Sequence, residues 1–459
     1  MRKKRIGEWK ILITDMTKGN ISRHLIKFAV PLVLANLFQL TYNAADSIIV
    51  GRFVGTEALA AVGTANPIMN IIIFFIIGIC MGASVLMSEY FGANDIKKFK
   101  REVSTTMIAG LIFTSIVIIL GIIFIEPILK LIQAPQEIIP DAAAYLRIIF
   151  LGLIFTFLYN AFASILRSIG DSKSPLIFLA ISAVLNVVMD IIFVVYFNMG
   201  VIGSGIATAT AEMFSSLFCI IYIYKKVPLL HFSKNEIILD KKLLKITINY
   251  SWVTAMQQTC LYVGKVFVQA AVNPLGVDAI ATFNAVNRVD DFAFTPQQSI
   301  SSAMTTFLAQ NRGGEKHHRI KEGLWTGLKL EMLFWCILVF SVYFGANNLM
   351  NLFVPNEGSK VIELGATYLH LMAFFYILPA WTNGIQGYFR GMGDLKVTLR
   401  STFVQMVGRV LFAYLLAPRF GIVGIALSCL GGWIIMLSYE VPILIKHRKE
   451  HARFIKNLT

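Results

Sequence analysis

The sequence is poor in charged residues. Only 15% of its 459 residues are Asp, Glu, Lys or Arg, whereas 56% are hydrophobic. A soluble globular protein of this composition would have a core too large for its polar surface to cover. Disorder is excluded as well, because disordered chains combine low hydrophobicity with high charge. The composition therefore excludes a soluble enzyme and favours a protein embedded in a membrane.

Cysteine clusters and nucleotide-binding motifs are also lacking. The five cysteines are far apart, and none forms a CxxC pair or a Cys/His group, which argues against a disulfide scaffold and structural zinc. No GxxxxGK[ST] motif occurs, so ATP is not expected to drive the protein directly. No small-residue cleavage site follows the basic N-terminus, so we expect no cleaved signal peptide. We expect neither a cofactor nor enzymatic activity.

Hydrophobic residues gather into runs that are long enough to span a membrane. A spanning helix needs about 20 residues. Twelve such runs lie at about 28–50, 60–90, 104–125, 143–165, 175–197, 201–224, 247–271, 280–308, 324–346, 364–388, 398–417 and 422–445. The sequence therefore predicts an all-α integral membrane protein with twelve transmembrane helices and short loops.

Positive charge is distributed unevenly between the loops. If the N-terminus is cytoplasmic, 33 of the 41 Lys and Arg residues fall in cytoplasmic segments, and only five fall in outer loops. This bias predicts that both termini face the cytoplasm. It also explains the net charge of +15 without nucleic acid. The basic arm at 1–27 and the tail at 446–459 are then cytoplasmic.

The two halves of the chain resemble each other. LRSIGDSKSPL at 166–176 aligns with FRGMGDLKVTL at 389–399, and VGTEALAAVGTANPI at 54–68 aligns with LGVDAIATFNAVNRV at 275–289. We therefore predict an N-lobe at 28–224, a cytoplasmic linker at 225–246 and a C-lobe at 247–445. Each lobe has six spans, an even number, so the repeat is parallel. Such repeats are typical of transporters that work by alternating access.

Polar residues within the first-lobe spans form a candidate ion site. Asn186 and Asp190 are four residues apart and share one helix face, while Asp46 and Thr208 lie on two other helices. Ionisable groups in a bilayer are costly and often functional. Two carboxylates, an amide and a hydroxyl suit a small hard cation, and close carboxylates also favour holding a proton. Na⁺ and H⁺ both remain open, as does a hydrogen-bonded network that only ties helices together.

The second lobe carries charges of the other sign. Lys265 lies where the first lobe has Asp46, and Arg409 lies where it has Asn186. Asp290 and Asp291 are on the neighbouring helix, so Lys265 is expected to pair with one of them. The alternatives are a buried charge network that holds the lobe together and contacts of Lys265 and Arg409 with an anionic substrate group.

The motif R-x-x-G-D-x-K occurs at the same place in both lobes, at 167–173 and 390–396. We interpret it as a cytoplasmic turn in which Gly takes a left-handed conformation and Asp caps the next helix. The basic pair is expected to suit the inner leaflet. Gly78 and Gly82 are expected to be close-packing positions.

Taken together, GNISRHLIKFAVPLV, YNAADSIIVGRFVGTEALAAVG, LRSIGDSK, N-x-x-x-D at 186–190 and TTFLAQNRGGEK make the chain resemble bacterial multidrug and toxic compound extrusion (MATE) transporters. The resemblance implies export of organic-cation or amphipathic drugs in exchange for Na⁺ or H⁺. It implies that Asp46, Asn186, Asp190 and Thr208 couple the cation. It also places Pro31, Gln39 and Tyr42 on a bent first helix, and we add Asn160 as a further substrate or conformational residue.

The predicted helix at 247–271 lacks the glutamate that marks members of the resembled family with a second-lobe sodium site, and it carries Gln257 and Gln258 instead. We expect a monomer in a bacterial plasma membrane, with small-molecule drugs and lipid as partners. The alternative function is a lipid-linked saccharide flippase of the same superfamily, which Lys265 and Arg409 keep open. A receptor or scaffold without transport is a third hypothesis.

Overall fold

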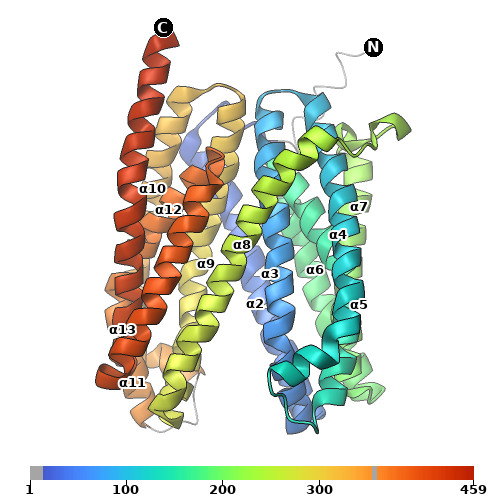
Figure 1. Ribbon diagram of the computed structural model, residues 1–459, viewed down its shortest axis with the longest axis vertical. Helices are drawn as coiled ribbons and strands as arrows, with labels where there is room; N and C mark the ends of the chain where they lie inside the picture. The colour runs from blue at the N-terminus through green and yellow to red at the C-terminus, as the bar shows by residue number, and fades with distance from the viewer. Residues whose placement is uncertain (1–13, 354–358, 459) are drawn as a thin grey trace. The chain divides into compact units, whose positions relative to one another are not determined.

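The computed structural model describes residues 14–353 and 359–458, and these residues form helices and loops without a β-strand. The helices of the first half are α2 (Ile21–Phe53), α3 (Thr56–Gly92), α4 (Ile96–Leu131), α5 (Ile139–Ser168), α6 (Lys173–Asp190), the π-helical η2 (Ile191–Tyr196) and α7 (Gly200–Lys226). In Figure 1, α4, α5 and α7 lie side by side.

The second half contains α8 (Lys241–Val272), α9 (Val277–Gly313), α10 (His317–Phe353), α11 (Ser359–Phe375), α12 (Ile377–Gly391) and α13 (Leu395–Leu458). The pair α11 and α12 is one bent span, with an angle of 46° at the break. Helix α13 is two helices joined at Gly421, whose backbone is not helical. Counted in this way, the described chain contains the twelve predicted transmembrane helices.

Length and hydropathy alone identify fewer spans among the described residues. Eight helices meet both criteria, or nine if α11 and α12 count as one span. Helix α9 does not meet them, since it carries Arg288, Asp290 and Asp291 in its middle, and α13 is counted once despite its break. The criteria of length and hydropathy thus miss α9 because of its charged residues, and they count the two helices of α13 as one.

The chain divides into two compact units. The first comprises Pro31–Ala255 with the described residues before Met16, and the second comprises Met16–Val30 with Met256–Thr459. The boundaries between these two units lie within α2 and α8. Helix α8 begins in the first unit because its early residues pack there: Thr254 donates a hydrogen bond to Gly78 O at 2.6 Å.

Close packing of α3 on α8 depends on the two glycines that the sequence singles out. A Cβ at Gly78 would lie 2.4 Å from the Cα of Ala255, and one at Gly82 would lie 2.6 Å from the Cα of Ser251. Backbone atoms cannot move aside as a flexible side chain can. The prediction that these glycines are close-packing positions is confirmed.

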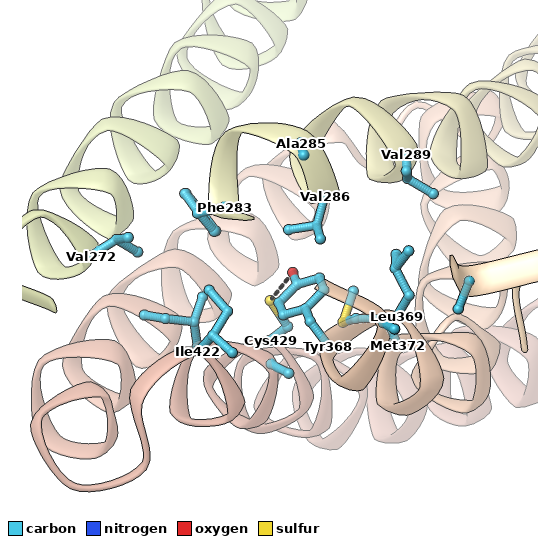
Figure 2. Close-up of a cluster of buried hydrophobic side chains, with 14 of the residues drawn as sticks. Val272, Phe283, Ala285, Val286, Val289, Tyr368, Leu369, Met372, Ile422 and Cys429 are labelled. Carbon is cyan, nitrogen blue, oxygen red and sulfur yellow. Dashed lines mark hydrogen bonds between the residues drawn. The ribbon is translucent and has the colours of Figure 1, made fainter. Parts of the chain in front are cut away.

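Each unit has its own apolar core. In the first unit, buried residues of α3 and α5, such as Ala61, Leu146 and Phe150, pack together. In the second unit, the core joins α9, α11 and α13, and Figure 2 shows Val286, Tyr368 and Ile422 within it. Tyr368 places a hydroxyl inside this apolar cluster, which is notable because a buried hydroxyl needs a partner.

The linker predicted at 225–246 is folded against the start of α4. Lys100 Nζ lies 3.0 Å from both carboxylate oxygens of Glu236, and Ile238 N donates to Ser104 Oγ at 2.8 Å. Helix α4 begins at Ile96, two turns before the predicted span, because Asp95 accepts the backbone N–H of Lys98 at 3.0 Å.

The repeated R-x-x-G-D-x-K turns have the predicted backbone. Gly170 has φ +86° and Gly393 has φ +79°, and Asp171 caps α6 by accepting the Ser174 N–H at 3.0 Å. The expectation for the arginines is wrong in the second half. Arg390 is buried and donates to Ser301 Oγ at 2.7 Å, so its charge serves the protein interior rather than the lipid surface.

Candidate functional site: an acidic interior in the first unit

Two carboxyl groups meet in the first unit. Asp46 lies on α2, and Asp190 is the last residue of α6 and has 0% exposure. The two carboxyl groups are near enough for their charges to interact, but neither oxygen of Asp190 has a hydrogen-bond partner among the described residues; Ser204 of α7 donates to Asp46 Oδ1 at 2.6 Å. Like charges at this range in a dry site repel, so the pair is suited to share a proton or to hold a cation.

Asp190 stands at a change in helix geometry. The α-helix α6 ends at Asp190, and the next six residues, Ile191–Tyr196, form the π-helix η2. Short π-helical segments are rare and occur frequently at functional sites. The wider turn begins at the carboxylate itself, so this part of the backbone departs from the regular helix at the residue that the sequence predicts to bind the cation.

The other two predicted coupling residues lie at a neighbouring cavity. Asn186 and Thr208 line a space of about 10 Å³ between α6 and α7. Asp46 and Asp190 are not among its lining residues, which are Leu179, Ser182, Ala183, Asn186, Thr208, Ala211, Glu212 and Ser215. The predicted set of four is thus arranged as a carboxyl pair and an adjacent cavity, joined by the single turn from Asn186 to Asp190.

Several polar residues of this site were not singled out from the sequence. Ser204 was missed, and so was the Ser182–Ser215 pair, whose hydroxyls are 2.6 Å apart. Helical spacing contains the relevant pattern: Ser204, Thr208 and Glu212 repeat every four residues on α7. Hydroxyl residues are common in membrane helices, however, so the spacing alone does not distinguish these from others.

The remaining first-half candidates are spread along α2 and α5. Pro31 lies inside α2 and is the first residue of this helix that belongs to the first unit. Gln39 is half-buried on the same helix. Asn160 donates its amide to Thr156 O within α5 at 2.8 Å. The side chain of Tyr42 lies outside the described residues.

In the second unit, Asp290 is enclosed by hydroxyl donors. It is 4% exposed, and it accepts hydrogen bonds from Tyr368, at 3.1 Å, and from Tyr376. Arg409 is also buried and provides a positive charge near Asp290 and Cys429. Figure 2 shows the contact of 4.0 Å between the Tyr368 hydroxyl and Cys429 Sγ. Asp290 and Arg409 therefore belong to one polar cluster inside an apolar core.

Lys265 is in a different environment. Its Nζ forms an ion pair with Asp291 Oδ1 at 3.0 Å, and the two side chains are 54% and 42% exposed. The adjacent acids of α9 thus diverge: Asp290 turns to the tyrosines of the core, and Asp291 turns to Lys265.

Helix α8 carries Gln257 in the region where some relatives of the resembled family have a glutamate. Gln257 Nε2 donates to Gln386 Oε1 and to Thr402 Oγ1, both at 3.1 Å. Further buried polar residues nearby, among them Glu440 and Arg390, were not predicted. A neutral amide with its donors satisfied holds helices together and brings no charge for a cation.

The MatE family profile matches the chain twice, at residues 31–192 and 254–415. The second match begins and ends 223 residues after the first, which is the offset of the R-x-x-G-D-x-K repeat. The two matches cover most of the chain and confirm its internal duplication.

Known proteins are similar over almost the whole length. The probable multidrug resistance protein YoeA of Bacillus subtilis is 28% identical over 457 residues, which span 96% of this chain and 97% of YoeA. The FAD transporter of Shewanella oneidensis is 24% identical and covers 83% of this chain and 85% of its own length. A crystal structure of MATE in complex with MaL6 superimposes with a TM-score of 0.89, at 21% identity, over 96% of this chain and 99% of that one. With twelve helices in a duplicated arrangement, an acidic interior in the first half and two profile matches in register, the chain belongs to the MatE family of multidrug efflux transporters.

Proposed function

We propose that this protein is a secondary active antiporter that exports organic-cation or amphipathic drugs in exchange for Na⁺ or H⁺. The observation that carries the proposal is the buried Asp190 carboxyl group, whose oxygens have no hydrogen-bond partner among the described residues, near Asp46 in the first unit. The relatives named for multidrug resistance support the choice of substrate class. The protein acts as a monomer in the bacterial cytoplasmic membrane with both termini inside. It needs no cofactor besides the coupling ion and catalyses no chemical conversion.

Coupling arises because the cation and the drug stabilise different conformations of the protein. A cation at the carboxyl pair favours one arrangement of the duplicated halves, and a drug favours the other. Each ligand therefore promotes release of the other, and the coupling is reciprocal. Parallel repeats of this kind support alternating access by movement of one half against the other.

Dye efflux from proteoliposomes tests the proposal, with Na⁺ and pH gradients imposed separately. We expect export to follow at least one gradient and to be lost in Asp46→Asn, while purification and thermal unfolding stay normal. FAD serves as an anionic comparison, because one relative is named an FAD transporter. Export that ignores both gradients, or an Asp46→Asn variant that exports normally, would contradict the proposal.

A further inference from the structure

The cavity between α6 and α7 has more oxygen ligands than the predicted coupling residues supply. Five of its lining side chains carry oxygen: Ser182, Asn186, Thr208, Glu212 and Ser215. Its volume of about 10 Å³ is close to the space that one water-sized particle needs. The cavity lies entirely within the first unit.

Polar atoms at this cavity lack partners. Asn186 is 1% exposed, yet neither its amide nitrogen nor its amide oxygen has a hydrogen-bond partner among the described residues. The buried Oε2 of Glu212 has none in the same part of the chain. Leaving such groups unpaired costs free energy, so unpaired groups in a native interior call for an explanation such as a bound ligand. Two of them line one small cavity, which points to a ligand that the cavity binds.

The chemistry of the lining identifies the ligand. No Lys, Arg or His side chain lines the cavity, and Glu212 is its one carboxyl group among the lining residues. Carboxylate, amide and hydroxyl oxygens are the ligands of hard cations. A proton needs a single oxygen, whereas five oxygen-bearing side chains around one small cavity suit a coordinated ion. A divalent ion would normally have more carboxylates, so the charge of the lining fits a monovalent cation.

We propose that this cavity is an inner Na⁺ site, with Glu212 as its carboxylate ligand and Ser182 and Ser215 as hydroxyl ligands. Asn186 and Thr208 are shared with the coupling site at Asp46 and Asp190, one helical turn away. The inference rests on the proposed cation-coupled export and adds a second cation position to it. The first unit then has two neighbouring cation positions, a Na⁺ position at the cavity and the coupling position at Asp46 and Asp190.

Equilibrium binding of ²²Na⁺ to the purified full-length protein tests this inference, with K⁺ as competitor. We expect saturable binding that K⁺ displaces poorly. Glu212→Gln should raise the Na⁺ concentration for half-saturation by at least about tenfold, because a charged ligand is lost. Ser215→Ala should raise it by less. Glu331→Gln is the matched control: Glu331 is a buried carboxyl with no partner among the described residues, but it lies on α10 in the second unit.

Four outcomes would each contradict one of the two proposals. Absence of saturable Na⁺ binding in the wild type, or wild-type affinity in Glu212→Gln, would overturn the inner site. If Glu212→Gln does not fold, as judged by thermal unfolding in K⁺ buffer, then Glu212→Asp and Ser215→Ala decide, and unchanged affinity in both overturns it. Asp46→Asn separates the two proposals: it should still bind Na⁺ at the inner site but fail to export dye. Normal export by Asp46→Asn would refute the antiport proposal, whatever its Na⁺ binding.

Discussion

The interiors of the two units hold their carboxyl groups in opposite ways. In the first unit, Asp190 is buried near Asp46 with neither of its oxygens hydrogen-bonded among the described residues, and Ser204 is the donor to Asp46. In the second, Asp290 is bonded to Tyr368 and Tyr376 and has the positive charge of Arg409 nearby. A carboxylate that is fully bonded and compensated has little reason to release or accept a cation. The duplicated fold thus holds an unpaired buried carboxyl group in one half, which the proposed function assigns to a cation, and a hydrogen-bonded carboxylate cluster in the other.

Asp190→Asn should show the largest effect. It keeps the volume of the side chain but removes the charge that binds the cation, so gradient-driven export should fall by about 100-fold, the upper range of a coupling free energy. Initial rates of dye efflux measure it, normalised to reconstituted protein. Export close to wild type would show that Asp190 does not couple the cation to export, and the functional contrast between Asp190 and Asp290 would be wrong.

Asp290→Ala should act on stability instead. The substitution leaves the hydroxyls of Tyr368 and Tyr376 without their acceptor inside an apolar core and removes the negative charge near Arg409. A buried hydrogen-bonding group left without its partner costs about 1–3 kcal/mol, so the midpoint of thermal unfolding in detergent should fall markedly. Export per folded molecule should change little. A variant with normal stability but no export would mean that Asp290 also acts in coupling.

Lys265→Ala probes the exposed ion pair of the second unit. Because Lys265 and Asp291 are both about half exposed, their pair should contribute less than about 1 kcal/mol. We expect Lys265→Ala and Asp291→Ala to lower the midpoint of thermal unfolding by the same small amount. The double variant should show no larger change than either single variant. Loss of export of an anionic substrate alone would show that Lys265 contacts the substrate.

Glu236→Gln gives the smallest expected effect and tests a surface carboxylate of the first unit. The backbone N–H of Ser233 and the ammonium of Lys100 hold the pKa of Glu236 below its ordinary value of 4.5. A lowered pKa stabilises the folded state above pH 4.5, and this contribution is lost as the pH falls through the folded-state value. The difference between wild type and Glu236→Gln in thermal unfolding should therefore stay below about 1 kcal/mol at neutral pH and shrink in acid. A difference that grows in acid would contradict this assignment.

Much of the fold could be predicted from the sequence because membrane helices depend on local composition. The twelve hydrophobic runs, the 223-residue offset and the Gly–Asp turns are all patterns of nearby residues. Helix ends were less predictable: α4 starts early because Asp95 caps it and the linker packs on it. The unit boundary within α8 could not be predicted, since it depends on the contacts of Thr254 and Ala255 with α3.

The candidate site shows the same difference between local sequence patterns and tertiary contacts. The sequence by itself determined that Asp46, Asn186, Asp190 and Thr208 are costly polar groups in membrane helices, and that the second half carries Lys265 and Arg409 instead. Only the tertiary structure decided which of these groups meet. It brought Ser204 to Asp46, Asn186 and Glu212 to one cavity, two tyrosine hydroxyls to Asp290, and Lys265 to Asp291. Hydropathy and spacing fix which face of a helix is polar, whereas the partner across the interface depends on how the helices pack.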